Sequence, residues 1–160
     1  MELKRDFEYQ GIWLFRYRGI LPLIILLMGI GLFSRAYVHP EPLPLESIPL
    51  QPNYEYFCLF IGIIGFAIRA YTVGYTPDNT SGRNVKKQIA DSLNTTGAYS
   101  IIRHPLYLGN FFMWLAPALL IGNLWFVLVF ILVFWLYYER IMYAEEQFLS
   151  KKFGSTFYNW

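Results

Sequence analysis

Charged residues are scarce in this sequence. Asp, Glu, Lys and Arg make up 15% of its 160 residues, against about 25% in a soluble domain. A single cysteine excludes a disulfide within the chain, and one cysteine with two histidines cannot form a self-contained zinc site. A net charge of +2 is too small to indicate a nucleic-acid partner. The sequence therefore predicts no metal centre, no disulfide scaffold and no binding to nucleic acid.

Apolar and aromatic residues are correspondingly abundant. Hydrophobic residues make up 56% of the chain and aromatic residues 20%, whereas a soluble domain has about 45–50% apolar residues. The core of a domain this small cannot bury so many large rings. We therefore expect a protein that resides in a lipid bilayer.

Four apolar segments approach the length of about 20 residues that a helix needs to cross hydrocarbon. The predicted spans are residues 19–38, 54–75, 105–122 and 124–143. The last two would form a tight helical hairpin that turns at Gly122-Asn123. The expected fold class is an all-α, polytopic integral membrane protein, with a single domain over residues 1–160.

The positions of Lys and Arg predict the orientation of these spans. Basic residues precede the first span, separate the second from the third and follow the fourth, but residues 39–53 contain none. Basic residues favour the cytoplasmic side, so both termini, the loop 76–104 and the tail 139–160 are expected in the cytoplasm. Residues 1–18 mix charges with aromatic rings and should lie along the inner interface. No cleavage site follows the first apolar run, which predicts a retained span.

One carboxylate near the cytoplasmic end of the fourth helix has an unusual position. We expect this helix to continue to about Phe153 and to stop at Gly154. Residues three and four apart share a helix face, so Glu145 lies on the same inward face as Ile141 and Leu149. A carboxylate aimed at packed surface is costly unless it has a partner. Glu145 is therefore a candidate functional residue on this pattern alone.

The tripeptide Arg103-His104-Pro105 has a purely structural interpretation. Proline is favoured at the first position of a helix, where its missing N–H costs nothing. Arg103 would then place its charge at the interface. For the tripeptide alone, this capping role is favoured over a functional one.

The polar segments on either side of the hairpin together resemble a known family. The run Gly97-x-Tyr99-x-x-x-Arg103-His104-Pro105-x-Tyr107-x-Gly109 is similar to one signature of the isoprenylcysteine carboxyl methyltransferase and phospholipid methyltransferase family. Glu145-Glu146-x-x-Leu149-x-x-x-Phe153-Gly154 is similar to the other. The resemblance covers about residues 54–160 and implies a membrane enzyme that uses S-adenosyl-L-methionine. The stretch from Thr80 to Asn110 looks most like bacterial branches, including enzymes that methylate a lipid A phosphate.

The resemblance also implies a site. In the family, the loop before the third span wraps the cofactor and the Glu-Glu helix closes over it. The positions that match cofactor-binding residues are Asn94, Tyr99, His104, Pro105, Leu106, Tyr107 and Glu146. Glu145 matches a glutamate near cofactor and acceptor, and it is expected to be catalytic together with Arg140. Relatives have an arginine four residues before this glutamate, where this chain has Ile141, and Arg140 lies about 100° round the helix from that position.

Three basic residues are candidates for binding the methyl acceptor. Arg69 lies near the inner end of the second span, and Arg83 and Lys86 lie in the loop 76–104. Attraction to anionic lipids explains Lys86 without any site. Arg69 could also take the role of the arginine that position 141 lacks.

The predicted acceptor is a lipid headgroup at the cytoplasmic face of a bacterial inner membrane. An anionic acceptor already carries its nucleophile at neutral pH, whereas an amine must first lose a proton. A phosphate such as the lipid A 1-phosphate therefore comes first, a prenylcysteine carboxylate second and a phospholipid amine third. No protein partner is implied.

Two other classes of protein fit part of the pattern. Sterol-type reductases, which use NADPH, share a related scaffold, but they usually have an acidic residue where Asn110 follows Gly109 here. A non-catalytic lipid-binding protein would explain the aromatic and basic residues. It gives no reason for two motifs that flank one hairpin.

Overall fold

The computed structural model describes residues 2–38, 52–77, 80 and 90–160. In these ranges the chain forms α-helices and one 3-10 turn, without any strand, which confirms the all-α prediction for the described residues. The helices are α1 (Glu2–Arg16), α2 (Ile20–Val38), α3 (Pro52–Tyr75), α4 (Pro105–Leu120), α5 (Leu124–Phe153) and α6 (Ser155–Asn159), and the turn η1 is Gly97–Ser100.

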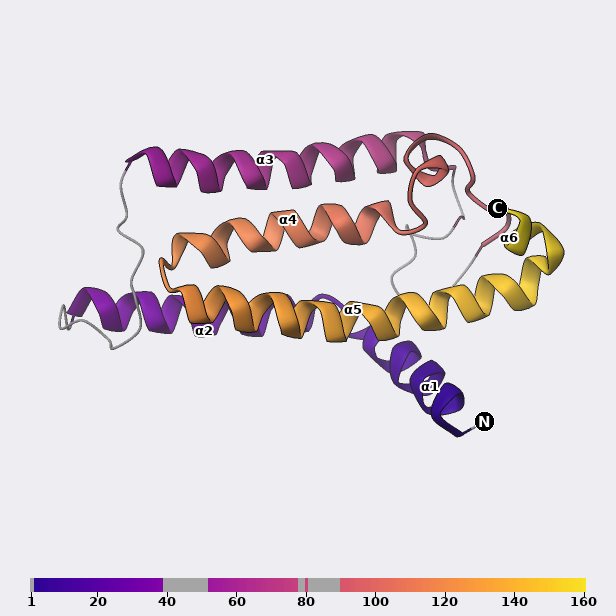
Figure 1. The fold of residues 1–160 in the computed structure, drawn as a ribbon, viewed down its shortest axis with the longest axis horizontal. Coiled ribbons are helices and arrows are strands. Elements are labelled where there is room, and N and C mark those ends of the chain that lie inside the picture. The colour runs from indigo at the N-terminus through magenta and orange to yellow at the C-terminus, as the bar shows by residue number, and fades with distance from the viewer. Residues whose placement is uncertain (1, 39–51, 78–79, 81–89) are drawn as a thin grey trace.

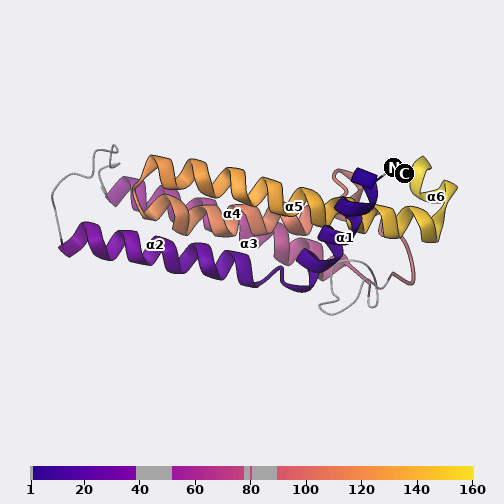
Figure 2. The ribbon, with the colours of Figure 1, turned by 90° about the horizontal axis from the view of Figure 1, so that it is seen from below.

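Helices α2 to α5 run along the long axis of the molecule (Figure 1). Helix α3 packs on α4, and α4 contacts both α2 and α5. Helix α1 leaves this bundle at one end and packs on the second half of α5. The N- and C-terminal ends lie at that same end of the molecule, together with α6 (Figure 2).

The hairpin between α4 and α5 turns where the sequence predicts. Gly122 has a φ of +71°, a conformation that favours glycine. The side chain of Asn123 caps α5 by accepting a hydrogen bond of 2.9 Å from the Phe126 N–H. Helix α4 begins at Pro105 and has 16 residues, whereas α5 has 30 and ends before Gly154. Helix α5 therefore extends beyond the start of α4.

Helices α3 and α4 approach each other closely at two glycines. A Cβ atom on Gly65 would lie 2.6 Å from the Met113 nitrogen and 2.7 Å from the Gly109 oxygen, so the two backbones are in contact. Small residues at such crossings are typical of membrane helix packing. A Cβ on Gly109 would lie 3.2 Å from the Cβ of Arg69. This crossing therefore fixes Arg69 against α4.

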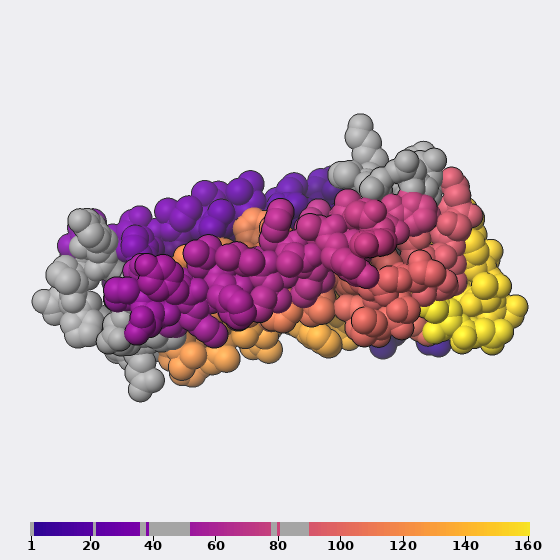
Figure 3. Space-filling model, turned by 90° about the horizontal axis from the view of Figure 1, so that it is seen from above, coloured from indigo at the N-terminus to yellow at the C-terminus, as the bar shows by residue number. Residues whose placement is uncertain are grey.

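Much of the apolar surface faces outward. Two helices, α3 and α5, are long and apolar enough to cross a membrane, by length and composition. Only 17% of the most apolar stretch of α3 and 28% of that of α5 is buried, unlike the core helix of a soluble protein. The apolar parts of α2 and α4 are shorter. Figure 3 shows α3 spread across one face of the molecule, with the C-terminal residues gathered at one end.

Candidate active site

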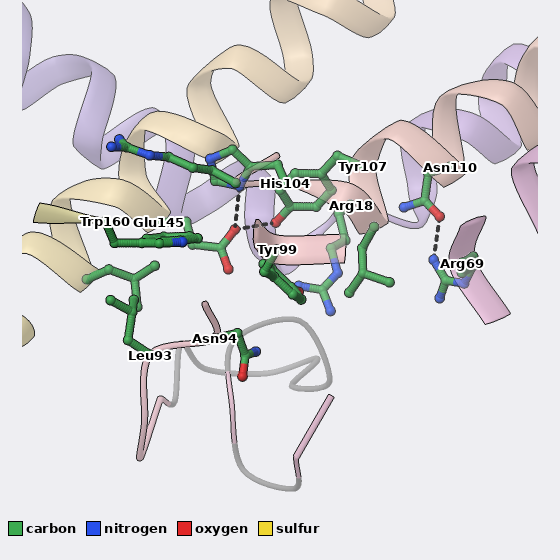
Figure 4. A pocket seen from close by; sticks show the side chains of 13 residues that line it. Arg18, Arg69, Leu93, Asn94, Tyr99, His104, Tyr107, Asn110, Glu145 and Trp160 are labelled. Atoms are coloured by element: carbon green, nitrogen blue, oxygen red, sulfur yellow. Dashed lines mark hydrogen bonds and ion pairs between the residues drawn. The ribbon is translucent and has the colours of Figure 1, made fainter. Parts of the chain in front are cut away.

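The segment before α4 and the second half of α5 meet at the end of the bundle that holds the termini (Figure 4). A pocket partly open to solvent lies there, and about 600 Å³ of space, part of it open solvent, lies between the atoms that line it. The lining residues are Arg18, Arg69, Leu93, Asn94, Tyr99, Arg103, His104, Leu106, Tyr107, Asn110, Glu145, Leu149 and Trp160.

Glu145 lies on the inward face of α5, as its spacing predicts. Ile141 is fully buried one turn before it and Leu149 is buried one turn after it, while Glu145 itself is 6% exposed. The Tyr107 hydroxyl donates a hydrogen bond of 2.9 Å to Glu145 Oε2. His104 Nδ1 lies 3.7 Å from the same oxygen. The buried carboxylate therefore has the partners that its burial requires.

His104 connects both glutamates of the motif. Its Nε2 lies 3.0 Å from Glu146 Oε1, and its ring stacks on Tyr107 with centroids 5.7 Å apart. Burial alone would lower the pKa of His104, but hydrogen bonds and charges of Glu145 and Glu146 outweigh it and raise this pKa to about 9. The hydrogen bond with His104 in turn lowers the pKa of Glu146. The imidazole is thus a cation at neutral pH.

Tyr99 and Asn94 contribute uncharged polar groups. Both are buried, and η1 carries Tyr99 into the pocket wall. Burial, and then the charge of Glu145, raises the pKa of Tyr99 to about 12. Its hydroxyl therefore stays protonated and can serve as a hydrogen-bond donor as well as an acceptor.

Arg103 attaches the C-terminal residues to the pocket. Its guanidinium carbon lies 5.1 Å from the ring centroid of Phe157 and 5.6 Å from that of Trp160. One of its nitrogens lies 4.0 Å from Glu146. Phe157 is buried, and Trp160 forms part of the pocket wall. Arg103 therefore joins the C-terminal residues to the segment before α4 and to α5, the helix that carries Glu145.

The described lining residues are predominantly cationic. They include three arginines and the protonated His104, against Glu145 in the lining and Glu146 next to His104 and Arg103. Arg69 donates a hydrogen bond to the Asn110 side-chain oxygen. Figure 4 shows Arg69 and Asn110 at one side of the pocket, apart from the group around Glu145.

The structure brings most of the predicted site residues together. The predicted residues that line the pocket are Arg69, Asn94, Tyr99, His104, Leu106, Tyr107 and Glu145. Two others do not line it. Glu146 binds His104 and does not line the pocket itself, and Pro105 lies in a different groove beside Ile68 and Tyr71. Arg83 and Lys86 lie outside the described residues.

Arg140 is not brought to the pocket. Its guanidinium donates hydrogen bonds to Gln10 Oε1 at 3.1 Å and to the Leu136 oxygen at 2.9 Å, and it lies 4.9 Å from the ring centroid of Phe7. The 100° between positions 140 and 141 directs this side chain toward α1, since Ile141 takes the inward face. Arg140 therefore holds α1 and does not face Glu145.

Several pocket residues were not predicted to form the site. These residues are Arg18, Leu93, Arg103, Asn110, Leu149 and Trp160. Helical spacing places Leu149 on the inward face with Glu145, and the same spacing could have indicated Asn110, three residues after Tyr107. No local signal marks Arg18 or Trp160, because their positions depend on how α1 and α6 pack.

Two curated proteins resemble part of this chain. Protein-S-isoprenylcysteine O-methyltransferase from Schizosaccharomyces pombe is 39% identical over 66 residues, which are 41% of this chain and 28% of that protein. The protein of the same name from Saccharomyces cerevisiae is 35% identical over 72 residues, 45% of this chain and 30% of that protein. The chain thus aligns with less than a third of the length of either relative. No solved structure matches it.

A family model for phospholipid methyltransferases matches residues 57–156. The match is longer than half of the chain and includes both motif segments. Methyltransferases of this type use S-adenosylmethionine as the methyl donor. Together with the two long apolar helices, the match indicates a membrane protein. The chain belongs to the phospholipid methyltransferase family.

Proposed function

We propose that this protein is an S-adenosylmethionine-dependent membrane methyltransferase that methylates an anionic lipid headgroup. The observation that carries the proposal is the convergence of His104 and Tyr107 on the buried carboxylate of Glu145, in a pocket partly open to solvent. Membership of the phospholipid methyltransferase family supports methyl transfer over sterol-type reduction.

The side chains that line the pocket suit the chemistry of S-adenosylmethionine. Aromatic faces such as those of Tyr107 and Trp160 attract a sulfonium, and the carboxylate of Glu145 suits the ammonium group of the cofactor. The residues proposed to hold the cofactor are Asn94, Tyr99, His104, Leu106 and Tyr107. Pro105 would contribute by starting α4, and Glu146 by fixing His104.

The cofactor supplies an electrophilic methyl group: as the acceptor oxygen bonds to this carbon, the carbon–sulfur bond breaks and a neutral thioether leaves. The protein needs chiefly to align the reactants and to exclude water. In this proposal Glu145 is a fixed negative charge, because Tyr107 and His104 already orient it. Arg103 excludes water by holding α6 and Trp160 over the pocket.

The charges in the pocket favour an anionic acceptor. The cofactor is itself a net cation, and the described pocket residues include more cations than Glu145 and the adjoining Glu146 can balance. An amine acceptor would add a positive charge and would need a base. A lipid phosphate such as the lipid A 1-phosphate is our first candidate. A prenylcysteine carboxylate is the second, favoured by the substrate in the names of both yeast relatives.

We also propose the membrane arrangement that the basic residues predict. Helices α2, α3, α4 and the first part of α5 are the four spans, and α1 lies at the inner interface. Both chain ends lie at the end of the bundle that holds the pocket. This placement supports a cytoplasmic location for the two chain ends and for the pocket. A bacterial inner membrane fits the acceptor proposed first.

Calorimetric titration of S-adenosylhomocysteine into the detergent-purified protein tests the cofactor proposal. We expect micromolar affinity for the wild type, with a weakening of about ten-fold or more in Glu145→Gln, since hydrogen bonds to charged groups contribute about 1.5–3 kcal/mol. His104→Ala should weaken binding similarly. Glu139→Gln is the matched control, because Glu139 is exposed on the same helix. A folded wild type that does not bind would refute the proposal.

Transfer of a labelled methyl group then tests the class of acceptor. We would compare monododecyl phosphate, N-acetyl-S-farnesylcysteine and phosphatidylethanolamine in mixed micelles. Labelling of either anion supports the proposal and identifies the preferred headgroup. Labelling of the amine alone would contradict it.

A further inference from the structure

Arg18 lines the same pocket as Glu145, although it comes from a distant part of the chain (Figure 4). It follows α1 and lies outside residues 57–156, the part that matches the family. No sequence pattern assigned it a role beyond orienting the chain in the membrane. Its location therefore requires an explanation from the packing of α1.

Several contacts dock α1 on α5 and so determine where Arg18 lies. A Cβ atom on Gly11 would lie 2.1 Å from the Arg140 oxygen, so only glycine permits this approach without movement. Phe15 is buried, and the Tyr137 hydroxyl donates a hydrogen bond of 3.1 Å to the Leu14 oxygen. The guanidinium carbon of Arg18 lies 4.1 Å from the ring centroid of Phe15. The buried ring thus supports the arginine.

The cations in the pocket other than Arg18 fall into two groups. His104 lies against Glu145 and Glu146, and Arg103 lies between Glu146 and the C-terminal rings. Each of these two is close to an acidic side chain. Arg69 instead binds the neutral amide of Asn110 and belongs to the opposite side of the pocket in Figure 4.

We propose that Arg18, together with Arg69, binds the anionic headgroup of the methyl acceptor and sets the preference for anionic over zwitterionic acceptors. This inference rests on the proposed function, because it names the residue that recognises the acceptor in that site. Helix α5 contributes no basic residue to the described pocket lining, and its Arg140 points toward α1. Guanidinium groups bind carboxylate and phosphate oxygens through paired hydrogen bonds. Such pairing would hold the acceptor oxygen in line with the transferred methyl group.

Substitution of Arg18 by glutamine tests this role, with Arg16→Gln as the matched control. Arg16 is exposed, carries the same charge two residues away and does not line the pocket. We expect Arg18→Gln to raise KM for monododecyl phosphate or N-acetyl-S-farnesylcysteine by about ten-fold or more, as for other charged hydrogen bonds. The affinity for S-adenosylhomocysteine should stay within about two-fold, and kcat should change less than KM. Arg18→Lys keeps the charge, so its KM for these acceptors should lie between those of the wild type and Arg18→Gln.

The two anionic acceptors distinguish a phosphate from a carboxylate as the natural headgroup. Lysophosphatidylethanolamine is the zwitterionic comparison, and its KM should not rise in Arg18→Gln. An unchanged KM for both anions would overturn the inference. So would a loss of S-adenosylhomocysteine affinity in proportion to KM, which would indicate a structural role for Arg18.

Direct binding of monododecyl phosphate without cofactor separates this inference from the proposed function. Binding that depends on Arg18 supports an anion site even in a protein that fails to bind S-adenosylhomocysteine. Binding that is equal in Arg18→Gln and Arg16→Gln overturns the inference. The cofactor proposal is then unaffected, because the titration of S-adenosylhomocysteine tests it separately.

Discussion

The imidazole of His104 and the carboxylate of Glu146 lie 3.0 Å apart, although 42 positions separate them in the chain. The contact joins the residue that precedes α4 to the second half of α5. Because the other nitrogen of the same ring lies 3.7 Å from Glu145, one histidine holds both glutamates of the motif. The positions of the Glu145 and Glu146 carboxylates in the pocket therefore depend on the charge of the His104 ring.

That charge predicts a pH dependence of stability. The pKa of His104 is raised to about 9 in the folded protein, against an ordinary value of about 6.5. A raised pKa means that the contribution of this cation is fully present below pH 6.5 and is lost as pH rises through about 9. The melting temperature of the wild type in detergent should therefore fall toward that of His104→Gln over this range.

The difference between the two proteins is the informative quantity. Groups that do not contact His104 should titrate alike in both, so their effects cancel. The comparison should start at about pH 6, above the range in which Glu146, with its lowered pKa, takes up a proton. A difference that stays constant from pH 6 to 9.5 would contradict a cationic His104.

The crossing of α3 and α4 predicts opposite effects for two glycines of one helix. Gly65→Ala places a methyl group 2.6 Å from backbone atoms of α4 and should lower stability by about 1–3 kcal/mol. Gly74→Ala meets nothing within 4 Å and should be neutral, or stabilising by up to about 1 kcal/mol. Thermal or denaturant unfolding in detergent measures both. Equal effects would mean that the close approach of α3 and α4 does not occur.

The contacts of Arg103 predict a specific loosening of the C-terminal residues. Lysine keeps the charge but cannot stack a planar group on Phe157 and Trp160, and each cation–π contact contributes about 0.5–2 kcal/mol. Arg103→Lys should therefore speed hydrogen exchange in residues 155–160 by about three- to ten-fold. Arg140→Lys removes a similar contact with Phe7 on α1 and should leave that exchange unchanged.

The membrane arrangement can be tested with single cysteines, because Cys58 is the one cysteine of the chain. In a Cys58→Ala background, Ser47→Cys should react with an impermeant maleimide from outside intact cells. Glu2→Cys and Thr156→Cys should react only after the membrane is permeabilised. Labelling of all three positions from the same side would contradict a single span between Glu2 and Ser47, and labelling of Glu2→Cys and Thr156→Cys from opposite sides would contradict an even number of spans.

Local features of the sequence were sufficient for much of the fold. The turn at Gly122 and Asn123 and the inward position of Glu145 both follow from residues within one or two helical turns, and the structure confirms them. The partners of Glu145 come from a segment about 40 residues away. The sequence indicated those partners only through resemblance to a family.

Features that depend on helix crossings could not be predicted in the same way. Arg18 and Arg140 differ little as sequence signals, since both are arginines near a membrane interface. Their different surroundings follow from the contact between Gly11 and the backbone of α5, which sets where α1 crosses. Neither helical periodicity nor composition reports such a crossing.

The hairpin has one more consequence, which concerns how the site tolerates sequence change. His104 precedes Asn123 by 19 residues and Glu145 follows it by 22, so the two arms measure about 28 Å and 33 Å at 1.5 Å per residue. Deleting one residue from the longer arm would rotate Glu145 by about 100° and direct it away from His104. Apolar side chains along the arms can be exchanged for others of similar size. The number of residues in one arm, however, cannot change without a matching change in the other. Among related sequences, we expect insertions and deletions to fall outside these two arms even where the residues within them vary.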